Sequence, residues 1–163
     1  MRVLLAFLLA GIAFVTAAEA AKPGQAAPPF ALPDATGATV SLAALRGRVV
    51  YVDFWASWCG PCRRSFPWMN AMRARYGKDG LTIVGVNVDK RRDDAERFLR
   101  DVPASFTIAY DAQGSTPAAY DVRGMPTSFL IDRQGIVVAV EEGFRDEHSS
   151  DVEARIRALL AQR

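Results

Sequence analysis

Residues 48–56, RVVYVDFWA, constrain the fold more than any other stretch of this chain. A continuous run of β-branched and aromatic residues predicts a strand that is covered on both faces, as in the parallel sheets of α/β proteins. The pattern becomes helical over residues 59–77, where Phe66 and Met69 have helical spacing and Gly77 is a stop signal. The rest of the fold must therefore be arranged around a buried strand that runs directly into a helix.

Strand and helix patterns alternate along the remainder of the chain. Strands are predicted over 81–89, 105–111 and 127–143, the last as two strands joined by a turn, and helices over 92–102, 115–122 and 152–160. Two short extended pieces within residues 30–42 predict an N-terminal β-hairpin. This order predicts an α/β fold in which helices flank a central mixed β-sheet on both faces.

Residues 1–20 have the layout of a secretory signal peptide. Arg2 precedes an apolar run over residues 3–15, and a small-x-small pattern ending at Ala20 is typical of a cleavage site. The alternative is an uncleaved membrane anchor, but the run is shorter than the roughly 18 to 20 residues that a spanning helix needs. In both cases we expect the protein to work outside the cytoplasm, in the periplasm or an equivalent compartment.

The composition fits one domain after this leader. Residues 21–29 are rich in Pro and Ala, which is typical of a linker, and residues 30–163 have the length of a single domain. The formal net charge is only +2, and the charged segment 89–100 mixes both signs. The sequence therefore indicates no nucleic-acid partner, and we interpret 89–100 as a solvated helix face.

Cys59 and Cys62 are the only two cysteines of the chain, and Gly60 and Pro61 separate them. As a structural disulfide the pair would stabilise little, because it closes a short loop. A closed zinc site needs about four Cys or His ligands, and the single histidine, His148, lies far along the chain. The third possibility is a reversible redox pair, for which the Cys-x-x-Cys spacing is typical.

The position of the pair, between strand and helix, favours redox chemistry. Unpaired N–H groups and the positive end of the helix dipole stabilise an anion there. Such a site lowers the pKa of a cysteine thiol from about 8.5 into a range that reaches roughly 3.5 to 7.5. We expect Cys59 to face solvent and act as the nucleophile, and Cys62 to attack the resulting mixed disulfide and release the reduced substrate.

Asp53 is the one acid within the apolar run. A buried carboxyl group is unfavourable unless it is paired, hydrogen-bonded or protonated, so Asp53 either lies at a wet edge or has a function. Six residues before Cys59, it is placed to lie beneath the pair and carry a proton to or from Cys62. The alternative is a solvated or structural acid.

Two segments carry a resemblance to a known family. Residues 52–62, VDFWASWCGPC, closely resemble the active-site stretch of thioredoxin, and residues 121–131, DVRGMPTSFLI, resemble the thioredoxin segment with a cis-proline opposite the cysteines. The resemblance implies a thioredoxin-like fold, a cis Met125–Pro126 bond and Pro126 packed near the disulfide. It also implies a substrate-contacting surface made of Trp58, Gly60, Pro61, Gly124, Met125 and Thr127.

The opening of the domain narrows the family further. Residues 30–59 resemble the start that extracytoplasmic TlpA/ResA-like proteins share with peroxiredoxins. The distance from residues 84–89 to Met125 leaves room for an additional central helix and strand, as in TlpA/ResA-like proteins. By this resemblance the chain is identified as an exported thiol:disulfide oxidoreductase that needs no cofactor beyond the redox-active Cys59–Cys62 disulfide.

The resemblance implies protein thiols or disulfides as substrates and a membrane electron donor. The expected activity is the reduction of protein disulfides, for example in apocytochrome heme-attachment cysteines or in copper-site cysteines during oxidase assembly. The direction of exchange and the oligomeric state stay open. One alternative is a non-enzymatic copper-handling protein with two thiolate ligands. Another is a thiol peroxidase, which Ala56 disfavours because peroxiredoxins resemble this segment but carry a threonine there.

Some residues near the motif have two interpretations. Trp58 either shields Cys59 and contacts partners or caps the core, whereas Phe54, Trp55 and Trp68 are expected to be packing residues.

Three further positions are compared with the family. In cytochrome-maturation relatives a glutamate directly follows the strand that corresponds to residues 86–88. Asp89 lies after this strand here and could replace that glutamate only from a shifted position. We therefore interpret Asp89 as a polar strand end. The lysine near the buried acid of thioredoxin aligns with Gly85, so the acid here is expected to be tuned differently. His148 is expected at the surface, near the start of the last helix.

Overall fold

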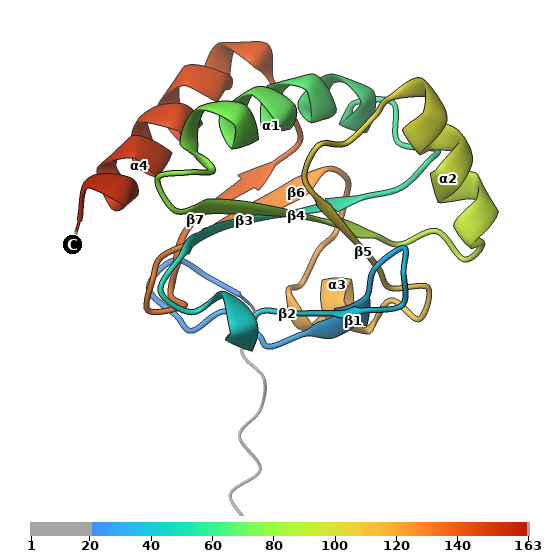
Figure 1. Cartoon of the computed structure of the whole chain (residues 1–163), viewed down its shortest axis with the longest axis horizontal. Helices are drawn as coiled ribbons and strands as arrows, with labels where there is room; N and C mark the ends of the chain where they lie inside the picture. Colours follow the sequence, from blue (N-terminus) through green and yellow to red (C-terminus); the bar gives the residue numbers. More distant parts are fainter. Residues whose placement is uncertain (1–20, 163) are drawn as a thin grey trace, which may run out of the picture.

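The computed structural model describes residues 21–162, and its centre is a five-stranded mixed sheet in the order β5-β4-β3-β6-β7 (Figure 1). The central strand β3 is parallel to β4, which is parallel to β5, whereas β6 is antiparallel to both β3 and β7. The strands span Val49–Trp55 (β3), Leu81–Asn87 (β4), Thr107–Tyr110 (β5), Thr127–Ile131 (β6) and Val137–Glu142 (β7). The predicted central mixed sheet is confirmed.

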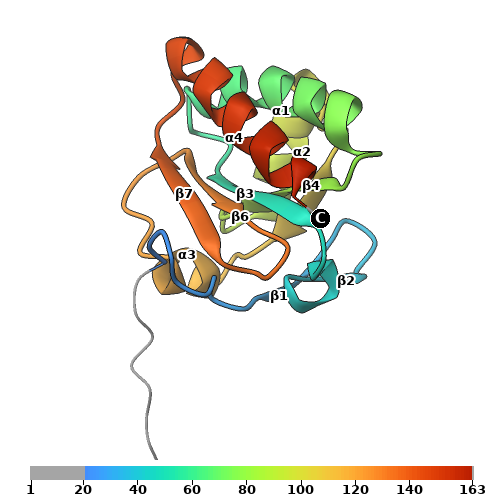
Figure 2. The same cartoon turned by 90° about the vertical axis from the view of Figure 1, so that its left-hand side faces the viewer.

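Helices cover both faces of this sheet. On one face lie α1 (Cys62–Tyr76), α2 (Arg92–Asp101) and α4 (Ser149–Ala161), which form the upper layer in Figures 1 and 2. The other face carries α3 (Ser115–Ala119) and the predicted N-terminal hairpin, followed by a short 3-10 helix; a second 3-10 helix precedes α4. The hairpin strands are β1 (Ala31–Pro33) and β2 (Thr39–Ser41), and the 3-10 helices are η1 (Ala43–Leu45) and η2 (Asp146–His148).

The continuous apolar run of β3 is explained by two separate packing layers. All seven residues of β3 are buried. Tyr51 and Trp55 pack in the cluster under α1 and α4, whereas Val52 and Phe54 pack in the cluster that includes the hairpin and α3. Because side chains alternate along a strand, Asp53 faces the helix layer that also contains the cysteines.

The apolar stripes of α1 and α4 pack against the same face. Phe66, Met69 and Met72 of α1 are almost completely buried, as are Val152, Ile156 and Leu159 of α4. Phe66 makes edge-to-face ring contacts with Trp55 of β3 and with Phe98 of α2. These aromatic contacts hold the start of α1, and with it Cys62, against the sheet.

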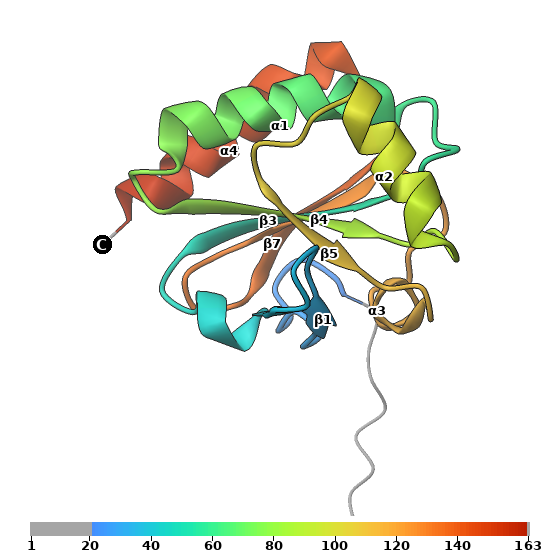
Figure 3. The same cartoon turned by 45° about the vertical axis from the view of Figure 1, so that its right-hand side comes forward.

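A helix and a strand are inserted between β4 and the Met125–Pro126 bond. Figure 3 brings this edge forward and shows β5 beside β4, with α2 above it. The strand β5 pairs with β4 from Val84 to Asn87, and α3 follows before the chain returns to β6. The predicted central helix-strand insertion is therefore confirmed.

The segment 21–29 is held on the domain and does not form a free linker. Ala26 bridges to Ile136, just before β7, the Gly24 N–H donates to the Val137 carbonyl at 2.8 Å, and Ala27 is buried. Composition could not predict this pairing, because its partner lies more than a hundred residues away.

The predicted signal peptide, residues 1–20, lies outside the described residues. Within 21–162 no helix has the length and apolar character to cross a membrane.

Candidate active site

The two cysteines lie where β3 delivers the chain to α1. Cys59 and Cys62 form a disulfide with a Cα–Cα distance of 5.4 Å, and α1 begins at Cys62. Cys62 has no exposed surface, whereas Cys59 keeps 4% of its surface exposed. The order of exposure is the predicted one, although Cys59 is more covered than the sequence led us to expect.

The sulfur of Cys59 lies at the positive end of α1. The Cys62 N–H donates a hydrogen bond to Cys59 Sγ at 3.2 Å. The first turn of the helix contains Arg63 and Arg64 and no acidic residue. The free N–H groups of a helix start stabilise a negative charge on this sulfur, and no acidic side chain in the first turn opposes it.

The surface beside Cys59 is open and apolar. Trp58 has 72% of its surface exposed, so it does not cap the core, and Gly60 and Pro61 are exposed as well. Trp55 and Phe54 are fully buried and Trp68 is partly buried, as expected for packing residues. An exposed tryptophan next to a disulfide is suited to contact a partner.

The segment predicted to lie opposite the cysteines enters β6 beside the end of β3. The Met125–Pro126 bond is cis, as the resemblance implied. Thr127 pairs with Phe54, and its Oγ1 donates to the Gly124 carbonyl at 2.7 Å. Met125 packs against the cluster that contains both cysteines. The structure thus brings the two predicted substrate-contact segments to the same end of the sheet.

Asp53 is buried in the middle of β3. Its side chain is 1% exposed; Ser128 Oγ, on the neighbouring strand β6, donates to Asp53 Oδ1 at 2.6 Å, and Oδ2 has no hydrogen-bond partner among the described residues. Burial raises the pKa of this carboxyl from 3.8 to about 7, against the opposing effect of the Ser128 hydrogen bond. The alternative that Asp53 lies at a wet edge is excluded, and Asp53 can exchange a proton near neutral pH.

The position that aligns with the thioredoxin lysine cannot hold a long side chain. Gly85 pairs in register with Asp53, and a Cβ there would lie 3.1 Å from Trp55 Nε1 and 3.0 Å from a ring carbon of Phe106. The buried indole therefore occupies the space beside Asp53 that the lysine would need. The residues paired with Asp53 on the two adjacent strands are Gly85 and Ser128. Neither is positively charged, so neither lowers the pKa of Asp53 by its charge.

Removal of the Ser128 hydroxyl is expected to raise the pKa of Asp53 above 7. The hydroxyl donates to Asp53 Oδ1, and this bond favours the carboxylate form. The measurement is the pH titration of the Asp53 carboxyl ¹³C resonance in the oxidised Ser128→Ala variant. Ser128→Thr keeps the hydroxyl and should titrate like the parent; an unchanged or lower pKa in the alanine variant would contradict the assignment.

Asp89 anchors the loop that leads to Cys59. It is 6% exposed and accepts hydrogen bonds from the Ser57 N–H at 2.9 Å, from Ser57 Oγ at 3.0 Å and from Asn87 Nδ2 at 2.8 Å. The interpretation of Asp89 as a simple polar strand end is thus incomplete. The sequence signal that was missed is the pair of polar residues, Asn87 and Asp89, at the end of an otherwise buried strand.

Asp89→Ala is expected to lower the free energy of unfolding by about 2 to 3 kcal/mol, because two part-buried donors of Ser57 and the buried amide of Asn87 lose their acceptor. The measurement is urea unfolding of the oxidised variant at pH 7. Asp79→Ala, at an exposed position, is the matched control and should change stability by less than about 0.5 kcal/mol. Equal effects in both variants would show that Asp89 does not hold the loop.

Metal ligands do not gather at this site. Within residues 21–162 no group of three or more His, Cys, Asp and Glu side chains could hold a metal ion. His148 is exposed at the start of α4, as predicted, and belongs to no such group.

A buried strand that leads through a Cys-x-x-Cys disulfide into a helix, with a cis-proline just before the adjacent antiparallel strand, defines a thioredoxin-fold disulfide oxidoreductase. The Redoxin family model matches residues 22–156. The thiol-disulfide oxidoreductase ResA of Geobacillus kaustophilus is 35% identical over 146 residues, 90% of this chain and 83% of that protein. ResA of Bacillus subtilis is 35% identical over 129 residues, 79% of this chain and 72% of that protein.

A solved structure is closer in sequence. A crystal structure from Chlorobium tepidum, described as a thiol:disulfide interchange protein DsbE, is 54% identical with a TM-score of 0.83; the match covers 86% of this chain and 99% of that chain. The chain belongs to the Redoxin family, as a TlpA/ResA-like thiol:disulfide oxidoreductase. Its chemistry is thiol–disulfide exchange with protein thiols and disulfides.

Proposed function

We propose that this protein reduces disulfides in exported proteins, with the cysteines of cytochrome c heme-attachment sites or of oxidase copper sites as its substrates. The observation that carries the proposal is the disulfide at the positive end of α1, with Cys59 as its more exposed sulfur. The Gly60-Pro61 dipeptide resembles that of reducing thioredoxins, whose couple lies near −270 mV. The ResA-like opening supports an extracytoplasmic location, and a membrane electron donor would restore the dithiol.

The reaction has two steps, and two electrons pass to the substrate. The Cys59 thiolate attacks one sulfur of the substrate disulfide, which forms a mixed disulfide and releases the other substrate sulfur as a thiolate. Cys62 then loses its proton, attacks Cys59 Sγ and releases the second substrate thiolate, while the Cys59–Cys62 bond forms. Both released thiolates take protons from water.

Asp53 is the proposed acceptor of the Cys62 proton. It faces the helix layer that contains Cys62, and its pKa of about 7 lets it take up a proton near neutral pH.

In the first step an extended substrate segment would lie across Trp58 and the Gly60-Pro61 dipeptide. The same segment would contact the chain around the cis bond at the exposed Gly124 and the partly exposed Met125, whereas the predicted contact residues Pro126 and Thr127 are buried.

The substrate assignment is tested by trapping. Cys62→Ala is expressed in a bacterial host that makes c-type cytochromes, and the proteins disulfide-linked to Cys59 are identified by mass spectrometry. Apocytochrome or copper-site peptides are the expected adducts. Recovery of unrelated secreted proteins would overturn the assignment, and recovery of stoichiometric copper with no adduct would favour the metal-handling alternative.

The direction is tested separately. Equilibration of the purified protein with thiol redox buffers should give a reduction potential of about −270 mV, as for thioredoxin. A reduction potential of about −120 mV would make the protein an oxidant.

A further inference from the structure

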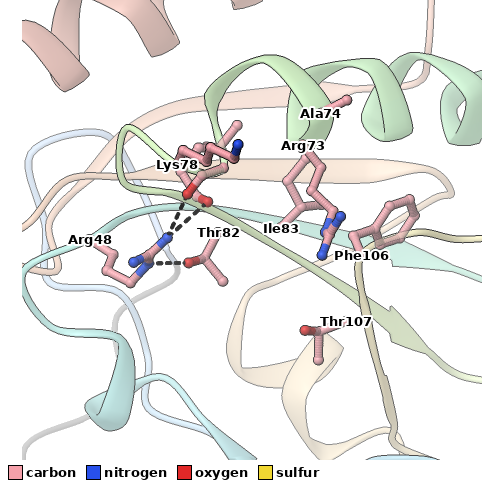
Figure 4. A pocket seen from close by; sticks show the side chains of 10 residues that line it. Arg48, Arg73, Ala74, Lys78, Thr82, Ile83, Phe106 and Thr107 are labelled. Carbon is pink, nitrogen blue, oxygen red and sulfur yellow. Dashed lines mark hydrogen bonds between the residues drawn. The ribbon is translucent and has the colours of Figure 1, made fainter.

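A polar cavity lies at the opposite end of β3 and α1 from the disulfide. Its volume is about 450 Å³, and Arg48, Arg73, Lys78, Thr82 and Thr107 line it together with the apolar side chains of Ile83 and Phe106 (Figure 4). Arg48 immediately precedes β3, whereas Cys59 follows it; Lys78 follows α1, whereas Cys62 begins it. The 15 residues of α1 span about 22 Å, so this cavity is not part of the redox site.

The charge around the cavity is of one sign. Three cations line it and no acidic residue does. Arg73 and Lys78 are exposed and form no ion pair with any residue in 21–162. On α2, by contrast, Arg92 and Arg97 are paired with acids of the same helix. Unpaired cations that converge on a concave site attract an anion more strongly than isolated surface charges do.

Arg48 is held in place before any ligand arrives. Its Nε donates to Thr82 Oγ1, and its Nη2 donates to the carbonyls of Gly77 and Leu81, each at 3.2 Å. The half-buried guanidinium thereby covers the carbonyl end of α1, which would otherwise repel an anion. Its Nη1 group lies outside these three bonds and is available for a ligand.

The open edge of β4 forms one wall of the cavity. The strand begins at Leu81, but its pairing with β5 begins only at Val84, which lies opposite Thr107. Figure 4 shows Arg48 and Thr82 on one side of the space and Arg73, Phe106 and Thr107 on the other. An anionic group can therefore be approached from both sides by cations and hydroxyl groups, with apolar surface beside it.

We infer that this cavity binds a small organic anion, with its phosphate or carboxylate group held by Arg48, Arg73 and Lys78. Guanidinium and ammonium groups with adjacent hydroxyls are the donors that oxyanions prefer. Ile83 and Phe106 offer apolar contact to the body of the ligand. The volume lies within the range of about 300 to 1,000 Å³ that is usual for small-molecule sites.

The test is a titration of the oxidised protein, followed by ¹H–¹⁵N NMR at constant ionic strength. Phenyl phosphate and benzoate are the two probes, which distinguish a phosphate site from a carboxylate site, and benzamide is the neutral control. We expect saturable shifts of the Thr82 and Thr107 amides with at least one anion and none with benzamide. The combined Arg73→Gln and Lys78→Gln variant should raise the Kd by about tenfold or more.

Arg97→Gln is the control for the loss of a cation outside the cavity, because it removes one positive charge near Ser57, at the opposite end of β3. It should leave the Kd unchanged, as should any change in the redox state of Cys59 and Cys62. Linear shifts with both anions, equal shifts with benzamide, or an unchanged Kd in the double variant would overturn the inference. Lys78→Glu alone is a second variant, at an exposed position, and it should also raise the Kd for the anion. Disulfide exchange is measured on the same samples, so the two proposals can fail independently.

Discussion

The Cys62→Ala variant is expected to form a stable mixed disulfide with a substrate and to lose turnover by on the order of 10³-fold or more. Cys59 keeps its place at the start of α1, so the first attack still occurs. No second thiol is then present to attack Cys59 Sγ, because the chain has only two cysteines. The first step is retained and the second is lost.

The measurement is the reduction of a model protein disulfide, with the adduct detected by intact mass. Cys59→Ala is the matched control and should form no adduct, since Cys62 has no exposed surface. The assignment of the two roles would be wrong if Cys59→Ala trapped substrate through Cys62, or if Cys62→Ala turned over at the rate of the parent.

Asp53→Asn is expected to stabilise the oxidised protein at pH 8 by at most about 4 kcal/mol and to have little effect at pH 4. The reason is the buried carboxyl, whose pKa rises from 3.8 in the unfolded chain to about 7 in the folded protein. This difference between the two pKa values corresponds to about 4 kcal/mol. An amide of the same shape carries no charge to desolvate.

The pH dependence follows from proton binding. Between pH 3.8 and about 7 the folded protein keeps a proton on Asp53 that the unfolded chain has released. The buried carboxyl therefore does not lower the free energy of unfolding below pH 3.8. It lowers this free energy progressively as the pH rises from 3.8 to about 7. Above that pH the full penalty of the buried carboxylate remains.

Guanidinium unfolding of oxidised Asp53→Asn and of its parent from pH 4 to pH 8 measures this difference. Asp79→Asn, at an exposed site, controls for the change in net charge and should give a flat difference. A stability difference for Asp53→Asn that does not grow with pH would show that the carboxyl is not protonated in the folded state.

Local patterns were sufficient to predict most of the fold. The apolar run of β3 and the helical spacing of Phe66 and Met69 indicated both elements, because each element buries a face with its own period. The same run made Asp53 conspicuous, since one acid stands in an otherwise apolar strand. The cis Met125–Pro126 bond came from family resemblance alone, and the residues around it carry no local signal for it.

The features that could not be predicted all depend on pairing between distant segments. Ser128 meets Asp53 only because β6 pairs with β3 in one particular register. Asp89 reaches the loop before Cys59 because β4 ends beside β3, and residues 21–29 join the domain through a partner near β7. The period of a strand defines its faces but not its neighbours, so such contacts need the folded structure.

The central claim is that the start of α1 holds Cys59 as a thiolate at neutral pH. The rate of alkylation of Cys59 by iodoacetamide, followed by site-resolved mass spectrometry in the reduced protein from pH 4 to pH 10, tests it most directly. We predict a midpoint within the range of roughly 3.5 to 7.5 that is found for cysteines at helix starts. A midpoint near 8.5, the value of an ordinary thiol, would contradict the account.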